Sequence, residues 1–192
     1  MGILFNSEDN SYFVRFMAST NSWKAGDEEV DIKKFLVDTE SIRTGWGCIQ
    51  LGLAPIWHWS DKVGVWEKRP GDTEEEMMSF KMGFRVDIFG KGFGIRTWSS
   101  TGTGAREGFE NMYVNILAGL AENKGKMPVV EYTGSIAKTV GTKGGATRVP
   151  QFKIERWVET AEFDITDEVL NAEPESKVVT DTDTDFDDEI PF

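Results

Sequence analysis

The chain has 192 residues, of which 39% are hydrophobic and 12% aromatic, enough for one folded domain with a core. Its one cysteine, Cys48, excludes an internal disulfide, and its one histidine, His58, leaves few routes to a zinc site or a histidine-based triad. The net charge is −12, but residues 1–158 hold 20 acids and 20 bases, whereas residues 159–192 hold 13 acids and one base. A neutral domain therefore precedes a strongly acidic extension.

The sequence lacks the usual signals for membrane insertion, secretion and catalysis. No run reaches the roughly 18 apolar residues of a membrane span, and the N-terminus has no basic and apolar signal regions. The glycines at 90, 92 and 94 lack the spacing of a dinucleotide loop, and Asp164 and Asp167 have no histidine or partner carboxylate for two-metal chemistry. We expect a cytoplasmic protein with no membrane partner, enzymatic activity, metal or cofactor.

The first half of the chain is rich in strand patterns. Tyr12–Ala18 and Val30–Asp38 are apolar runs of strand length, and Gly45–Leu53 is aromatic and punctuated by glycines, which suits a bent strand. Ser79–Phe89 is the clearest strand, because apolar and polar residues alternate along it. The apolar positions of that strand are Phe80, Met82, Phe84, Val86 and Ile88.

One segment has a helical period. Apolar residues recur at spacings of three and four between Phe109 and Leu120, which predicts an amphipathic helix over about 104–123. Thr103 is the expected cap of this helix, and Gly125 and Pro128 are expected to end it.

The residues after the helix predict an extended, basic β-hairpin over about 129–158. Its arms are 129–140 and 151–158, joined by a long glycine-rich connection at 141–150. Five or six strands with one late helix are compatible with a mainly β, OB-fold-like small barrel over residues 1–170, although a sandwich stays open. Low hydrophobicity and repeated Thr-Asp pairs predict that residues 171–192 form a disordered acidic tail.

The last eight residues join a dense negative cluster to an apolar pair. Such a tip can insert Phe192 and Ile190 into an apolar pocket while basic partner residues hold its carboxylates, and Pro191 limits the entropy lost. A tail that serves only solubility has no reason to end on large apolar groups. The predicted partner-binding residues are Asp185, Phe186, Asp187, Asp188, Glu189, Ile190, Pro191 and Phe192.

This tip, DFDDEIPF, resembles the acidic tip of bacterial single-stranded DNA-binding proteins, with Glu189 in place of Asp. The strand-rich body with its closing hairpin, running into Pro150–Ile154 and Trp157, resembles the divergent single-stranded DNA-binding proteins of bacteriophages. The resemblance implies sequence-tolerant binding and protection of single-stranded DNA in phage replication, recombination or repair, in the host cytoplasm. It also implies that the tip recruits a polymerase, helicase-primase or nuclease, chiefly through Phe192 and Pro191.

A single-strand surface needs cations for phosphates and aromatic faces for bases. Between residues 41 and 60 the only full charge is Arg43, and three tryptophans accompany it. If Ile49 and Leu51 face the core, strand alternation places Trp46 on the opposite face. Acid-free stretches with basic residues also occur between Asp87 and Glu107 and in the hairpin. The predicted DNA contacts are Arg43, Trp46, Trp57, Trp59, Lys62, Trp66, Lys68, Arg69, Lys91, Phe93, Arg96, Trp98, Lys138, Lys143 and Arg148.

Plainer interpretations stay open for these residues. Any one tryptophan is more often core than ligand, Cys48 fits a buried small hydrophobe, and the basic hairpin fits an ordinary solvated loop. The competing function is an acidic interaction protein or DNA mimic that inhibits a host nucleic-acid enzyme. The neutral body argues against a mimic, because mimics spread acids over the folded surface. Whether the chain forms a homo-oligomer stays open.

Overall fold

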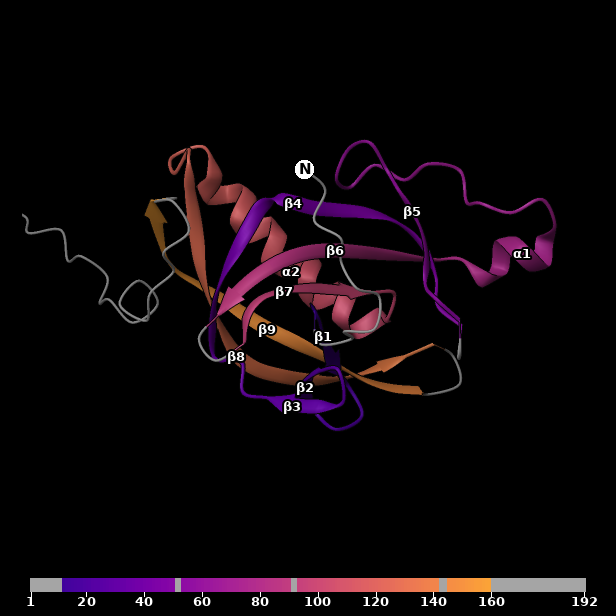
Figure 1. Cartoon of the computed structure of the whole chain (residues 1–192), viewed down its shortest axis with the longest axis horizontal. Helices are drawn as coiled ribbons and strands as arrows, with labels where there is room; N and C mark the ends of the chain where they lie inside the picture. The colour runs from indigo at the N-terminus through magenta and orange to yellow at the C-terminus, as the bar shows by residue number, and fades with distance from the viewer. Residues whose placement is uncertain (1–11, 51–52, 91–92, 142–144, 160–192) are drawn as a thin grey trace, which may run out of the picture.

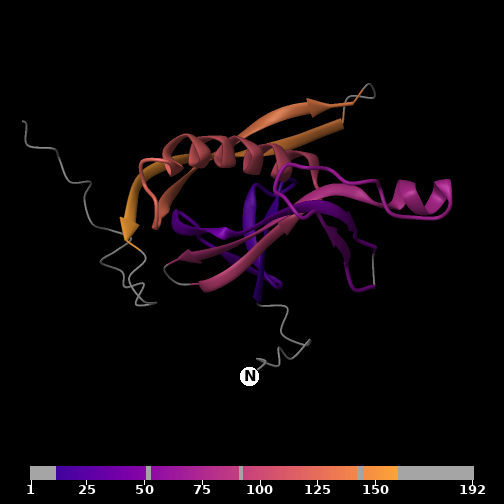
Figure 2. The same cartoon turned by 90° about the horizontal axis from the view of Figure 1, so that it is seen from above.

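The computed structural model describes residues 12–50, 53–90, 93–141 and 145–159. Within these ranges the strands form one sheet with the order β3-β2-β1-β7-β6-β4-β8-β9, and β5 pairs with β4 beside that path. Figures 1 and 2 show the sheet curling into a half-barrel, with α2 lying along the β8–β9 hairpin. The elements are β1 (Phe13–Met17), β2 (Ser22–Ala25), β3 (Glu28–Val30), β4 (Lys34–Cys48), β5 (Ile56–Trp59), α1 (Glu74–Ser79), β6 (Lys81–Gly90), β7 (Gly94–Ser100), α2 (Thr103–Leu120), β8 (Lys126–Val140) and β9 (Gly145–Glu159).

The predicted mainly β fold with a barrel-like sheet is confirmed. The strands β7-β6-β4-β8-β9 are consecutive neighbours, and α2 lies between β7 and β8 in the chain, which is the late position expected for the helix. The short strands β1, β2 and β3 extend this sheet beyond β7, and β1 runs parallel to β7. The sequence did not predict β2, β3, β5 or β7 as strands.

One hydrophobic core joins the sheet to α2. Phe84 of β6 and Phe109 of α2 have parallel rings with centroids 4.1 Å apart, and Trp98 of β7 meets the Phe84 ring edge-on at 4.8 Å. All three side chains are buried. The helix also buries Met112 and Ile116, as its apolar spacing predicts.

The ends of α2 differ from the prediction. Gly102 is the N-cap, with an extended backbone, so the prediction of Thr103 as the cap is wrong because Thr103 is already helical. The helix stops at Leu120, before the predicted end at 123. Pro128 lies within β8, opposite Trp157 of β9, and does not serve as a simple helix stop.

The expectation of a single helix is wrong, because α1 forms a short helix between β5 and β6. Thr73 and Glu76 make a capping box at its start: the Thr73 hydroxyl accepts from the Glu76 amide, and the Glu76 carboxylate accepts from the Thr73 amide. The spacing Thr-x-x-Glu is visible in the sequence and was the signal for this helix.

The extended hairpin is confirmed, but its long connection is not. Pairing of β8 with β9 runs from Lys126 opposite Glu159 to Val140 opposite Gly145, so residues 145–150 belong to β9. The hairpin also packs tightly on α2: a Cβ on Gly108 would lie 2.5 Å from the carbonyl oxygen of Pro150. Glycine at this position therefore allows the helix to rest on the strand backbone.

A bulge in β4 joins two segments that the sequence predicted as separate strands. Asp38 pairs with Asp87 and Arg43 pairs with Arg85, so residues 39–42 stand opposite Val86 alone. The side chains of Val37 and Ile42 are both fully buried, although strict alternation from Val37 would place Ile42 on the opposite face. Strict alternation would turn residue 43 inward, and the bulge turns it outward.

Asp38 and Ser41 hold the bulge together. The Asp38 carboxylate accepts hydrogen bonds from the amides of Glu40 (2.9 Å) and Ser41 (3.3 Å). The Ser41 hydroxyl donates to the Asp38 carbonyl oxygen (2.7 Å) and accepts from the Asp87 amide (2.8 Å). One hydroxyl therefore links the bulged strand to its neighbour β6.

We predict that Ser41→Ala lowers the free energy of unfolding by about 1–2 kcal/mol, because the Asp87 amide and the Asp38 carbonyl each lose a partner. Urea denaturation followed by tryptophan fluorescence measures the change. Thr39→Ala removes a hydroxyl elsewhere in the same bulge and is the control. Equal stability of the two variants would show that the Ser41 bridge contributes nothing.

Candidate nucleic-acid interface

Strand pairing places glycines, tryptophans and cations together on the outward face of β4, β5 and β6. Residues directly opposite each other in antiparallel strands share a face. Gly45 lies between Trp59 of β5 and Gly83 of β6. Gly47 likewise lies between Trp57 and Lys81.

Gly47 and Gly83 leave room on this face for the ring of Trp57. A Cβ on Gly47 would lie 2.4 Å from Cζ3 of Trp57, and a Cβ on Gly83 would lie 2.6 Å from the same atom. The Trp57 ring therefore occupies the space that side chains at these positions would fill. Trp57 and Trp59 stack with centroids 4.5 Å apart and planes 11° apart, and both are partly buried. The result is a pair of parallel indoles supported by the sheet.

Two arginines stand directly opposite each other next to this aromatic pair. Arg43 is exposed, and its guanidinium donates to the carbonyl oxygens of Glu40 and Ile42, both at 2.7 Å. Arg85 lies 3.5 Å from an Asp87 oxygen, which also accepts a hydrogen bond from Thr97. Like charges directly opposite in a sheet destabilise it, and an anion between them would remove that cost.

Lys81 and Arg85 share the outward face with Trp57, and neither was predicted from the sequence as a contact. Their signal was the polar half of the alternation in β6, where Lys81, Gly83 and Arg85 occupy every second position. Alternation of this kind predicts a strand but does not by itself indicate that the polar residues contact a ligand.

Trp46 lies on the inward face, so the prediction that it faces away from a buried Ile49 is wrong. Trp46 is 7% exposed and Ile49 is 53% exposed. The Trp46 indole donates to the Glu67 carbonyl oxygen at 2.9 Å, and the Arg69 guanidinium lies 4.6 Å over its ring. Trp46 and Ile49 do lie on opposite sides, but the premise that Ile49 faces the core fails, because β4 ends at Cys48 and Ile49 is exposed beyond that end.

Three of the predicted contacts from β7 and the residue before it lie away from the outward face. Trp98 is fully buried and Phe93 is 5% exposed, and both belong to the core. Arg96 pairs with the buried Ile88, on the inward side of β6. We therefore leave these residues out of the candidate interface.

The remaining predicted contacts are scattered over other elements. Lys62 and Lys68 are exposed in the segment between β5 and α1, and Trp66 of that segment is partly buried with its ring edge-on to Trp46. In the hairpin, Lys138 is ion-paired with Glu107 at 2.6 Å, and Arg148 lies 3.4 Å from the Ser135 hydroxyl. Lys91, Lys143 and the tip at 185–192 lie outside the described residues.

Comparison with known proteins gives no match: no family model, no curated protein and no solved structure is similar to the chain. Within the described ranges, no group of three or more His, Cys, Asp or Glu side chains is placed to hold a metal ion. Neither α1 nor α2 has the length and apolar content needed to cross a bilayer.

We predict that Arg43→Gln changes the free energy of unfolding by less than about 1 kcal/mol, because relief of the repulsion from Arg85 offsets the loss of the hydrogen bonds to the Glu40 and Ile42 carbonyl oxygens. The effect should shrink in high salt, which screens exposed charges. Urea denaturation at low and high salt measures it, with Lys62→Gln as a charge-matched control outside the sheet. A clear loss of stability at low salt would mean that Arg43 is a structural residue.

Proposed function

We propose that the chain binds single-stranded DNA without sequence preference through the outward face of β4, β5 and β6. It would cover and protect single strands in phage DNA replication, recombination or repair, with residues 185–192 recruiting replication proteins. The observation that carries the proposal is the stacked Trp57–Trp59 pair next to the opposed Arg43 and Arg85.

The chemistry of this face suits a single strand. Stacking on an aromatic ring contributes roughly 1–3 kcal/mol per base and tolerates any base, because every base has a π face. Lys81 lies directly opposite Gly47, and the Arg43–Arg85 pair adjoins the Gly45–Gly83 pair on the same face of the sheet. These three cations can neutralise phosphates there. Neither a catalytic step nor a cofactor is needed.

The position of this face in the barrel also supports the proposal. OB-type barrels bind oligonucleotides on the face of their second and third strands and through the loop after the first strand. In the series β4, β6, β7, β8, β9, the second strand is β6, and β5 lies in the connection between the first and the second. In a barrel of this type, the tryptophans of β5 and the cations of β6 would lie at ligand-binding positions, which supports the proposal.

We predict that Trp57→Ala and Trp59→Ala each weaken oligo-dT binding by about 1–3 kcal/mol, or roughly 5- to 150-fold. Anisotropy titration of a labelled oligonucleotide measures the affinity, and circular dichroism checks the fold. His58→Ala is the matched control, since His58 lies on the same strand but meets Phe80 on the other face. Failure of the unaltered protein to bind oligo-dT at low salt would sink the proposal and favour a DNA mimic.

The tip and the DNA surface should be separable. Residues 171–192 carry a net charge of −7, so they would compete with DNA for the same cations. We predict that deleting residues 185–192 leaves oligo-dT affinity unchanged or raised and abolishes binding to purified replication proteins. Phe192→Ala keeps the tip's side-chain charge and should lose only partner binding. Lost oligonucleotide binding on deletion would place the DNA contacts in the tip.

A further inference from the structure

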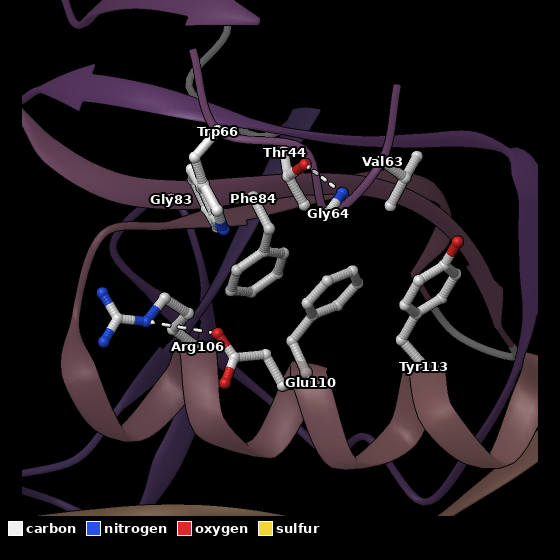
Figure 3. A pocket seen from close by; sticks show the side chains of 10 residues that line it. Thr44, Val63, Gly64, Trp66, Gly83, Phe84, Arg106, Glu110 and Tyr113 are labelled. Carbon is white, nitrogen blue, oxygen red and sulfur yellow. Dashed lines mark hydrogen bonds and ion pairs between the residues drawn. The ribbon is translucent and has the colours of Figure 1, made fainter. Parts of the chain in front are cut away.

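A cleft of about 200 Å³ opens on the inward side of the same strands, between α2 and the segment that follows β5 (Figure 3). Four aromatic side chains line it: Trp66, Phe84, Phe109 and Tyr113. The rings of Phe84, Phe109 and Tyr113 form a parallel series, with interplanar angles of 5° and 6°. Burial raises the pKa of the Tyr113 hydroxyl, which at its ordinary value is already protonated at neutral pH. The lining of the cleft is mainly apolar.

Polar groups of both kinds border these rings. Arg106 Nε lies 3.5 Å from Glu110 Oε1, and Figure 3 shows the pair at one end of the aromatic series. The Thr44 hydroxyl accepts from the Gly64 amide at 2.8 Å, which leaves its own proton free to donate. A mainly apolar cleft with a donor and an acceptor at its rim suits the apolar faces and polar edge of a nucleobase.

The cleft and the tryptophan surface lie on opposite sides of β6. Gly83 has the Trp57 ring against its outward side and lines the cleft on its inward side. The connection after β5 leads from one side to the other, because the chain runs from Trp59 through the exposed Lys62 to Val63 and Trp66 of the cleft. A strand that follows this segment passes a cation on its way from one site to the other.

We propose that the cleft receives one unstacked base of the bound strand, with Arg106 and Glu110 meeting the base edge. This inference rests on the proposed single-strand binding and extends it from a flat stacking surface to a path that wraps the β5 edge. A base fits better than an apolar side chain of a protein partner, because an apolar group would leave the Arg106–Glu110 pair desolvated and without new hydrogen bonds.

Photo-cross-linking of the full chain to oligo-dT carrying single 5-iododeoxyuridines, followed by peptide mapping, tests the path. We expect cross-links at Trp66 or Tyr113 from one set of positions and at Trp57 or Trp59 from another. Cross-links confined to Trp57 and Trp59 would overturn the cleft and leave the proposed function intact. Absence of both cross-links and oligonucleotide binding would overturn both.

A substitution at the rim gives an independent measurement. Arg106→Gln should weaken oligo-dT binding about tenfold, the effect of losing a hydrogen bond from a charged group. Its melting temperature should match that of Asn115→Ala, the control on an exposed position of the same helix. Unchanged affinity in Arg106→Gln would count against the cleft, whatever the effect of Trp57→Ala.

Discussion

The bulge in β4 is the constraint on which the rest of the arrangement depends. It inserts residues 39–42 opposite Val86 and so changes which side chains of β4 face the core. Ile42 and Trp46 turn inward as a result, and Arg43 turns outward. Because the side-chain period of a strand is two, a strand without the bulge would bury the arginine and expose the tryptophan. Core packing and the outward surface are therefore set by the same few hydrogen bonds around Asp38 and Ser41.

The outward face carries features that folding alone does not favour. Arginines opposite each other repel, and glycines within strands weaken them and leave room for a ring. Trp57 fills that room, so the glycines and the aromatic pair form one unit. Such local costs are typical of binding surfaces, where a ligand supplies the missing interaction. Under the proposed function, Arg43 and Arg85 would contact an anion and Trp57 would stack on a base.

The spacing of apolar residues along the chain predicted the elements whose structure depends mainly on nearby residues. The alternation around Phe84 and the helical spacing around Phe109 both lead to buried faces, and the hairpin was recognised from its two strand-like arms. The bulge was not predicted, because its hydrogen bonds depend on the partner strand β6. The outward surface was incompletely predicted for the same reason. The sequence alone does not distinguish Trp57 from the buried Trp98. Only the pairing of β4 with β5 and β6 brings Lys81 and Trp57 to the two sides of Gly47.

The central claim of the proposed function is that Arg43 and Arg85 contact phosphates. The salt dependence of oligo-dT affinity measures phosphate contacts, with a log-log slope of about −0.7 for each contact in a single strand. For the double variant Arg43→Gln/Arg85→Gln, the account predicts a slope shallower by about 1.4 than that of the unaltered protein. An unchanged slope would contradict it, because the strand would then lie on some other face of the molecule.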